Sequence, residues 1–137
     1  MRGVAAVALL VWIAVVSVPV ITGAQAAKGG NPNAAAVKNP AKVTPESIAK
    51  GRQAYNKACR HCHGLGAQGD GPLAPKNPSP ANLTDAKWEY GDSDGEIYAI
   101  ISNGVGGKSE MKGLRSELTA TEMWNIVNYI RSLGPKP

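Results

Sequence analysis

The chain has 137 residues, with 15 Lys and Arg against 10 Asp and Glu, for a formal net charge of +5. Residues 1–43 carry four of these bases and no acid, so residues 44–137 have a net charge of only +1. A globular nucleic-acid-binding protein carries a basic surface on its folded part, and the near-neutral remainder excludes that class. The remainder is also small and lacks Phe, so we expect a metal or cofactor to complete its core.

The first 26 residues have the order of a secretory signal peptide. Arg2 precedes an apolar run from Val4 to Val16, and Ala24-Gln25-Ala26 supplies small residues for cleavage after Ala26. The alternative is an uncleaved membrane anchor, since residues 4–21 are just long and apolar enough to reach across a bilayer. Both interpretations place the remaining residues outside the cytoplasm, in the periplasm. Cleavage, which gives a soluble protein, is the favoured one.

Residues 27–43 are rich in Ala, Asn, Lys, Pro and Gly, and Val is their only larger apolar residue. Such a segment cannot bury enough apolar surface to order itself, so the sequence predicts a flexible linker here. This linker is either a disordered N-terminus or a tether between an anchor and the domain. Residues 44–137 are predicted to form that single domain.

Three helices, and no strand, are predicted in the domain. Each has a start signal: Thr-Pro-Glu at residues 44–46, acids and glycine at 94–96, and a capping box at 119–122. Stop signals follow the second and third helices at residues 103–104 and 134–135. The predicted fold class is therefore all-α, with long loops between the helices.

The first helix ends at Cys59-Arg60-His61-Cys62-His63, the C-x-x-C-H motif of c-type haem attachment. Two thiols one helical turn apart can both add to vinyl groups on neighbouring pyrroles of one porphyrin. His63 then lies beneath the iron, where Nε2 binds the metal and Nδ1–H donates to a carbonyl. We therefore predict one covalently bound haem c, with His63 as the proximal axial ligand.

Three other interpretations of this motif are weaker. A thioredoxin-like redox pair needs a βαβ context, and no strand pattern occurs. A zinc site needs a second pair of ligands, whereas the only histidines, His61 and His63, share one turn. A disulfide between Cys59 and Cys62 leaves His63 and the long loop of residues 64–92 without a role. That loop is too long for a simple connection, which favours wrapping around a bound group.

Methionine is the remaining candidate for the second axial ligand. Met111 lies in a loop among charged and glycine residues, where an apolar side chain needs a specific reason. Met123 falls in phase with the apolar face of the third helix, so we expect it in the core. Met111 is the predicted distal ligand, with Met123 or an open site as the alternatives.

Over residues 44–134 the chain resembles the class I cytochromes c of bacterial type. The resemblance rests on C-x-x-C-H after an N-terminal helix, a methionine in a downstream loop and a C-terminal helix just after it. It implies an all-α fold in which three or more helices and long loops wrap around one haem with His/Met ligation. It also implies that Gly51 and Tyr55 on the first helix meet Ile126 and Tyr129 on the last where the two helices cross.

The segment Gly64 to Pro75 also resembles the bacterial members of that family. By that likeness the carbonyl of Pro72, or of Pro75, accepts the Nδ1–H bond of His63. Trp88 or Tyr90 reaches a haem propionate or, equally, covers the loop as a half-exposed aromatic.

These observations predict an electron-transfer protein rather than an enzyme, with no catalytic residues. It exchanges single electrons with redox partner proteins outside the cytoplasm. The alternative function is that of a haem-bearing subunit in a larger respiratory, photosynthetic or dehydrogenase complex. A haem enzyme or gas sensor requires an open iron. Six bases near the ligand-bearing segments form either a positive docking rim or an ordinary solvated surface: Lys57, Arg60, Lys76, Lys108, Lys112 and Arg115.

Overall fold

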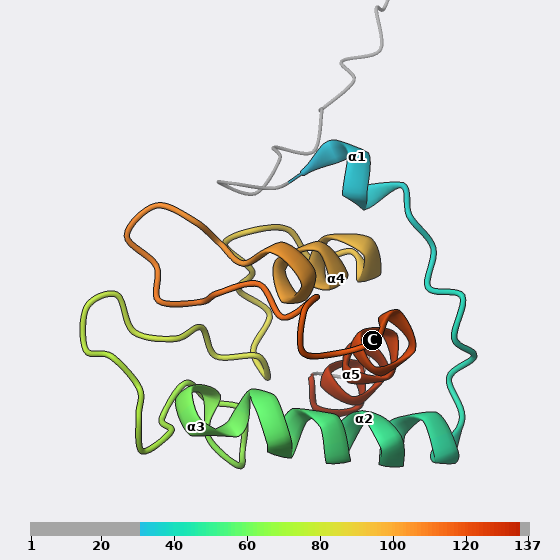
Figure 1. Cartoon of the computed structure of the whole chain (residues 1–137), viewed down its shortest axis with the longest axis horizontal. Coiled ribbons are helices and arrows are strands. Elements are labelled where there is room, and N and C mark those ends of the chain that lie inside the picture. Colours follow the sequence, from blue (N-terminus) through green and yellow to red (C-terminus); the bar gives the residue numbers. More distant parts are fainter. Residues whose placement is uncertain (1–30, 135–137) are drawn as a thin grey trace, which may run out of the picture.

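The computed structural model describes residues 31–134. Five helices follow one another: α1 (Pro32–Ala35), α2 (Pro45–Ala58), α3 (Arg60–His63), α4 (Asp94–Asn103) and α5 (Ala120–Leu133) (Figure 1). Within that span no strand forms, and the one β-bridge joins Gly104 to Lys112. The all-α prediction is thus confirmed. The predicted signal peptide or anchor lies outside the described residues, and among residues 31–134 no helix has the length and apolar character to cross a membrane.

The crossing of α2 and α5 is the largest helix–helix interface of the domain. Gly51 allows the close approach, because a Cβ there would lie 2.9 Å from Cβ of Tyr129 and still closer to the Asn125 carbonyl. Beside this point the rings of Tyr55 and Tyr129 pack with their centroids 5.2 Å apart. The predicted crossing of the first and last helices is therefore present in the structure.

As expected, α2 and α5 begin at their predicted capping residues. The Thr44 side chain accepts a hydrogen bond from the backbone N–H of Ser47, with Pro45 in the first turn. Thr119 and Glu122 form a reciprocal capping box at the start of α5. Met123 is buried in the core, 3% exposed, as its phase on α5 predicted.

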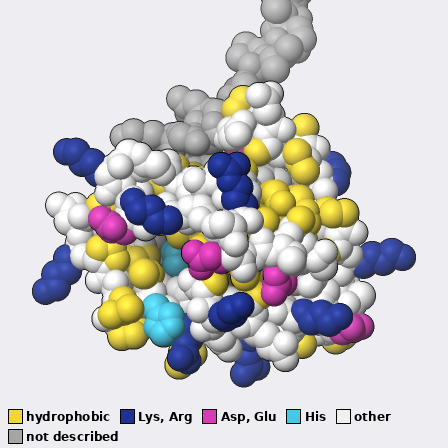
Figure 2. All heavy atoms as spheres, in the orientation of Figure 1, with side chains coloured by type: hydrophobic (Ala, Val, Ile, Leu, Met, Phe, Trp, Pro, Cys, Tyr) yellow, Lys and Arg dark blue, Asp and Glu magenta, His cyan; other side chains and the backbone are white. Residues whose placement is uncertain are grey.

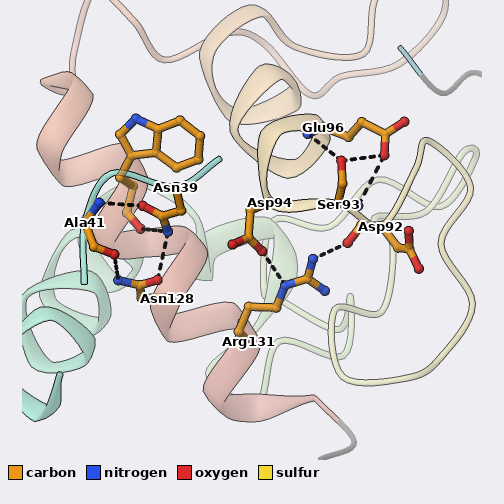
Figure 3. A network of polar contacts seen from close by, with 9 residues as sticks. Asn39, Ala41, Asp92, Ser93, Asp94, Glu96, Asn128 and Arg131 are labelled. Carbon is orange, nitrogen blue, oxygen red and sulfur yellow. Dashed lines mark hydrogen bonds and ion pairs between the residues drawn. The ribbon is translucent and has the colours of Figure 1, made fainter. Parts of the chain in front are cut away.

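Residues 31–43 differ from the predicted flexible linker. The short helix α1 packs on α4, where a side chain at Gly95 would collide with the carbonyl of Ala34. Further along, the Asn39 amide donates to Oδ1 of Asn128 on α5 over 2.8 Å (Figure 3). Order here comes from polar contacts to the domain together with the burial of small residues such as Ala34, which composition does not indicate. The linker prediction is wrong for this segment, which we call the N-terminal strap.

Candidate haem site

A mostly apolar cavity of about 300 Å³ is lined by residues of α3 and of the loop that follows α4. Residues from every part of the domain line it, including Ala58 at the end of α2, the loop around residues 78–91, Ile97 and Ile101 of α4, and Ile126 and Ile130 of α5. Four predicted ligand residues share it: Cys59, Cys62, His63 and Met111.

The attachment motif is held by α2 and the single turn α3. The backbone N–H of Cys59 donates to the Tyr55 carbonyl over 2.8 Å, which continues the α2 hydrogen-bond pattern into the motif. Burial, together with the nearby Cys62 thiol, raises the pKa of the Cys59 thiol to about 12. Both cysteines are free thiols in the structure. Both cysteines line the cavity, and vinyl addition would require them as thiols.

His63 is oriented by a backbone carbonyl. Its Nδ1 lies 3.1 Å from the carbonyl oxygen of Ala81. Because a carbonyl only accepts, Nδ1 carries the proton and Nε2 keeps the lone pair that a metal needs. Burial lowers the pKa of His63, and the bond to Ala81 opposes this shift only in part. The imidazole is thus neutral near pH 7.

The acceptor for His63 was predicted to be Pro72 or Pro75, and this prediction is wrong. Residues 71–73 instead fold back on the attachment turn, where the N–H of Leu73 donates to the His61 carbonyl. A hydrogen bond from Leu83 N–H to the Ala67 carbonyl then brings Ala81 alongside His63. The backbone carbonyl of Ala81 carries no side-chain signal that a sequence could show.

Met111 lies on a loop that is clamped at its base by backbone bonds. The N–H of Val105 donates to the Met111 carbonyl over 3.1 Å, and Leu114 N–H donates to Ile101 at the end of α4 over 2.9 Å. The Ser109 hydroxyl accepts from the Met111 N–H. Met111 is among the residues that line the cavity, whereas the other candidate, Met123, is in the core and not among them.

Side chains that sequence reasoning did not select also line the cavity. Lys87 and Ser109 supply polar groups, and Gly91 adopts a positive φ of 94° beside the half-buried Trp88 and Tyr90. Of the six bases expected around the opening, only Lys112 is in the lining. Figure 2 shows Lys and Arg spread over this face with Asp and Glu among them, so the view does not show a continuous positive rim.

The residues present fit a covalently bound haem. Two free thiols, a neutral imidazole and a thioether share one cavity whose walls are otherwise mainly apolar. These are the groups that bind haem through thioether bonds and axial coordination.

Comparison with known proteins agrees with this donor set. Residues 46–130 match the model of the family described as cytochrome C oxidase, cbb3-type, subunit III. The chain belongs to this family of c-type cytochromes. The cytochrome is similar to the cbb3-type oxidase subunit FixP of Sinorhizobium medicae, with 30% identity over 85% of this chain and 43% of that protein. It is also similar to the subunit CcoP of an Azospirillum species, with 28% identity over 64% of this chain and 29% of that protein.

Solved structures give the same fold. A chain of the reducing HAO-like protein complex of Kuenenia stuttgartiensis matches with a TM-score of 0.63 and 29% identity, over 72% of the cytochrome and 50% of that chain. Cytochrome cL of Methylophaga aminisulfidivorans matches with a TM-score of 0.53 and 27% identity, over 64% of the cytochrome and 53% of that chain. The cytochrome spans less than half the length of the curated relatives reported above.

Proposed function

We propose that this cytochrome binds one haem c through thioether bonds to Cys59 and Cys62, with His63 and Met111 as axial ligands. It transfers single electrons between redox proteins outside the cytoplasm. The observation that carries the proposal is an apolar cavity lined by all four residues. When bound, the haem iron supplies the one-electron couple.

The protein's residues hold the two axial side chains in place. The Ala81 carbonyl fixes the ring of His63, and the clamped loop base fixes Met111. If His63 and Met111 both bind the iron, no position on it would be left for a substrate, which would suit electron transfer rather than catalysis. The apolar walls exclude water and, with thioether ligation, favour the reduced state and raise the reduction potential.

Electrons leave and enter most readily beside Cys62. Two of the large exposed apolar side chains, Leu65 and Leu73, are 71% and 69% exposed and lie next to the attachment turn. The Leu73 carbonyl is 3.8 Å from the Cys62 sulfur. A redox partner that covers these leucines approaches the cavity at its attachment edge, through a small and short-lived interface.

Visible spectra of the protein, exported by a host that attaches haem, test the ligand assignment. We expect sharp α and β bands on reduction and colour that survives acid–acetone extraction. A weak far-red sulfur-to-iron band in the oxidised form should disappear in Met111→Ala and persist in Met123→Ala. A colourless protein refutes the whole proposal. Carbon monoxide binding to the reduced wild-type protein refutes ligation by Met111.

A second candidate is a haem-bearing subunit of a larger oxidoreductase. It is favoured by the match to a family named for an oxidase subunit, and by relatives that are named as subunits of cbb3-type oxidases. A fixed subunit co-purifies with its complex in a constant ratio, even in high salt. A mobile carrier is recovered alone.

The N-terminal segment decides how either form is delivered. We propose that residues 1–26 are removed on export, with retention of an anchor at residues 4–21 as the alternative. The intact mass of the exported protein distinguishes them, because cleavage after Ala26 leaves a chain that begins at Ala27.

A further inference from the structure

Arg131, in the last turn of α5, joins three groups at the start of α4 and in the loop before it. Its Nε donates to the Asp94 carboxylate over 2.8 Å, and its Nη2 donates to the Asp92 carbonyl (Figure 3). The guanidinium carbon also lies 5.7 Å from the centroid of the Trp88 ring. An exposed ion pair alone contributes little, since both side chains are 37% exposed. The contact with Trp88 also links Arg131 to the wall of the cavity.

Trp88 belongs to a short stretch of chain that forms part of the cavity wall. Trp88, Tyr90 and Gly91 all line the cavity. Just after Gly91 this stretch is held by Glu96, whose carboxylate accepts hydrogen bonds from both the N–H and the hydroxyl of Ser93. The Glu96 carboxylate also packs so closely on Gly91 that any side chain there would collide with it. At the Trp88 end the fixing group is the guanidinium of Arg131.

The indole N–H of Trp88 does not hold the ring in place. Within residues 31–134 its indole N–H donates no hydrogen bond to another residue, although the ring is half-buried in the wall. The planar guanidinium suits this place, because it can stack on an aromatic face while its edge donates to oxygen acceptors. A lysine keeps the charge but cannot make this combination.

We propose that Arg131 is a positioning residue that holds Trp88 in the wall of the haem cavity and thereby sets the reduction potential. The inference rests on the proposed function, since it concerns the wall of the same cavity. When the guanidinium is lost, the indole moves more freely and water reaches the cavity. Water stabilises the more highly charged ferric state, so the potential falls.

The test measures reduction potential and, by NMR of the reduced protein, hydrogen exchange of the Trp88 indole N–H. The variants are Arg131→Lys, which keeps the charge, and Arg131→Met, which removes it. Arg52→Met, on the exposed face of α2, is the control for loss of one positive charge. We expect both Arg131 variants to lower the potential and to speed indole exchange about two- to fivefold, as for the loss of one cation–π contact. Arg52→Met should change neither.

A purely structural role for Arg131 gives a different pattern. If Arg131 acts through Trp88, Arg131→Lys produces no further shift in potential in a Trp88→Leu background, which has no aromatic ring for the guanidinium to contact. Unchanged potential and exchange in both Arg131 variants, or an undiminished shift in that background, overturns the proposal. If Arg131→Met fails to fold, Arg131→Lys, which keeps the charge, carries the test by itself. Failure of the proposed function is separate, because the wild-type protein then lacks the haem spectrum.

Discussion

Asn128 is the residue whose loss should most weaken the attachment of the N-terminal strap. It is 1% exposed, and its Oδ1 accepts from Asn39 over 2.8 Å. Its Nδ2 donates to the Ser47 hydroxyl over 2.7 Å and to the carbonyls of Ala41 and Lys42 over 3.2 and 3.3 Å. One side chain thus connects α2, α5 and the strap. Asn128→Ala removes all of these contacts and leaves the buried Ser47 hydroxyl without the Asn128 donor.

The structure gives the magnitude. The bonds to Asn39 and Ser47 count as two, and the weaker contacts to the carbonyls of Ala41 and Lys42 count together as about one. Each hydrogen bond contributes about 0.5–1.5 kcal/mol. We therefore expect Asn128→Ala to lower the free energy of unfolding by about 2–4 kcal/mol, measured by urea denaturation of the haem-loaded protein. Hydrogen exchange of the strap amides should accelerate more than that of the α2–α5 core. Asn39→Ala, which removes only the strap's side of the contact, should cost about 1 kcal/mol.

Asn56→Ala is the matched control. It also replaces asparagine by alanine inside a helix, but the Asn56 side chain makes no hydrogen bond within the described residues. The gain in helix propensity, a few tenths of a kcal/mol, is then common to both variants. If Asn128→Ala and Asn56→Ala have the same stability within about 0.5 kcal/mol, the network does not hold the strap. Unchanged exchange in the strap refutes the same reasoning.

Three further substitutions test other contacts. Gly51→Val should lower the free energy of unfolding, measured in urea, by at least about 1–3 kcal/mol, because the valine side chain would collide with the backbone of α5. Gly134→Ala is the control and should be near neutral, because a Cβ there meets no other atom within 4 Å. Tyr55→Phe should cost about 1–2 kcal/mol in the same assay, since it removes a buried 2.8 Å bond to a backbone carbonyl; a cost near zero contradicts this. Hydrogen bonds from Thr119 hold the pKa of Glu122 below its ordinary 4.5, so the carboxylate stabilises the fold above pH 4.5. Glu122→Gln should therefore be less stable than wild type at pH 7, and the difference should vanish as acid titration passes the lowered pKa; a pH-independent difference contradicts this.

The helices could be predicted from sequence because their signals are local. Thr44 with Pro45, and the Thr119–Glu122 pair, lie within one turn of the ends they determine. The C-x-x-C-H motif is likewise contiguous. The capping box of Ser93 and Glu96 is equally local, and it shows that the start of α4 had a stronger signal than the acids used to predict it.

The features that could not be predicted depend on distant partners or on backbone atoms. Asn39 and Asn128 lie 89 positions apart, and nothing in either residue type indicates the other. Composition therefore predicted a flexible linker where the structure has an ordered strap. The acceptor for His63 is a backbone carbonyl, which every residue has, and a bond between Leu83 and Ala67 selects Ala81. The position of Ala81 beside His63 depends on how the long loop of residues 64–92 folds.

The two side chains proposed as axial ligands, His63 and Met111, are supported in different ways, and this asymmetry follows from the fold. His63 ends a turn that continues α2, and α2 is locked against α5 by the close approach at Gly51 and by the asparagine network. Met111 is on a loop held at its base by backbone bonds to the end of α4. A one-electron couple works best when neither ligand moves between oxidation states. In the proposed site the His63 side would meet this requirement by helix packing, and the Met111 side by a short backbone clamp.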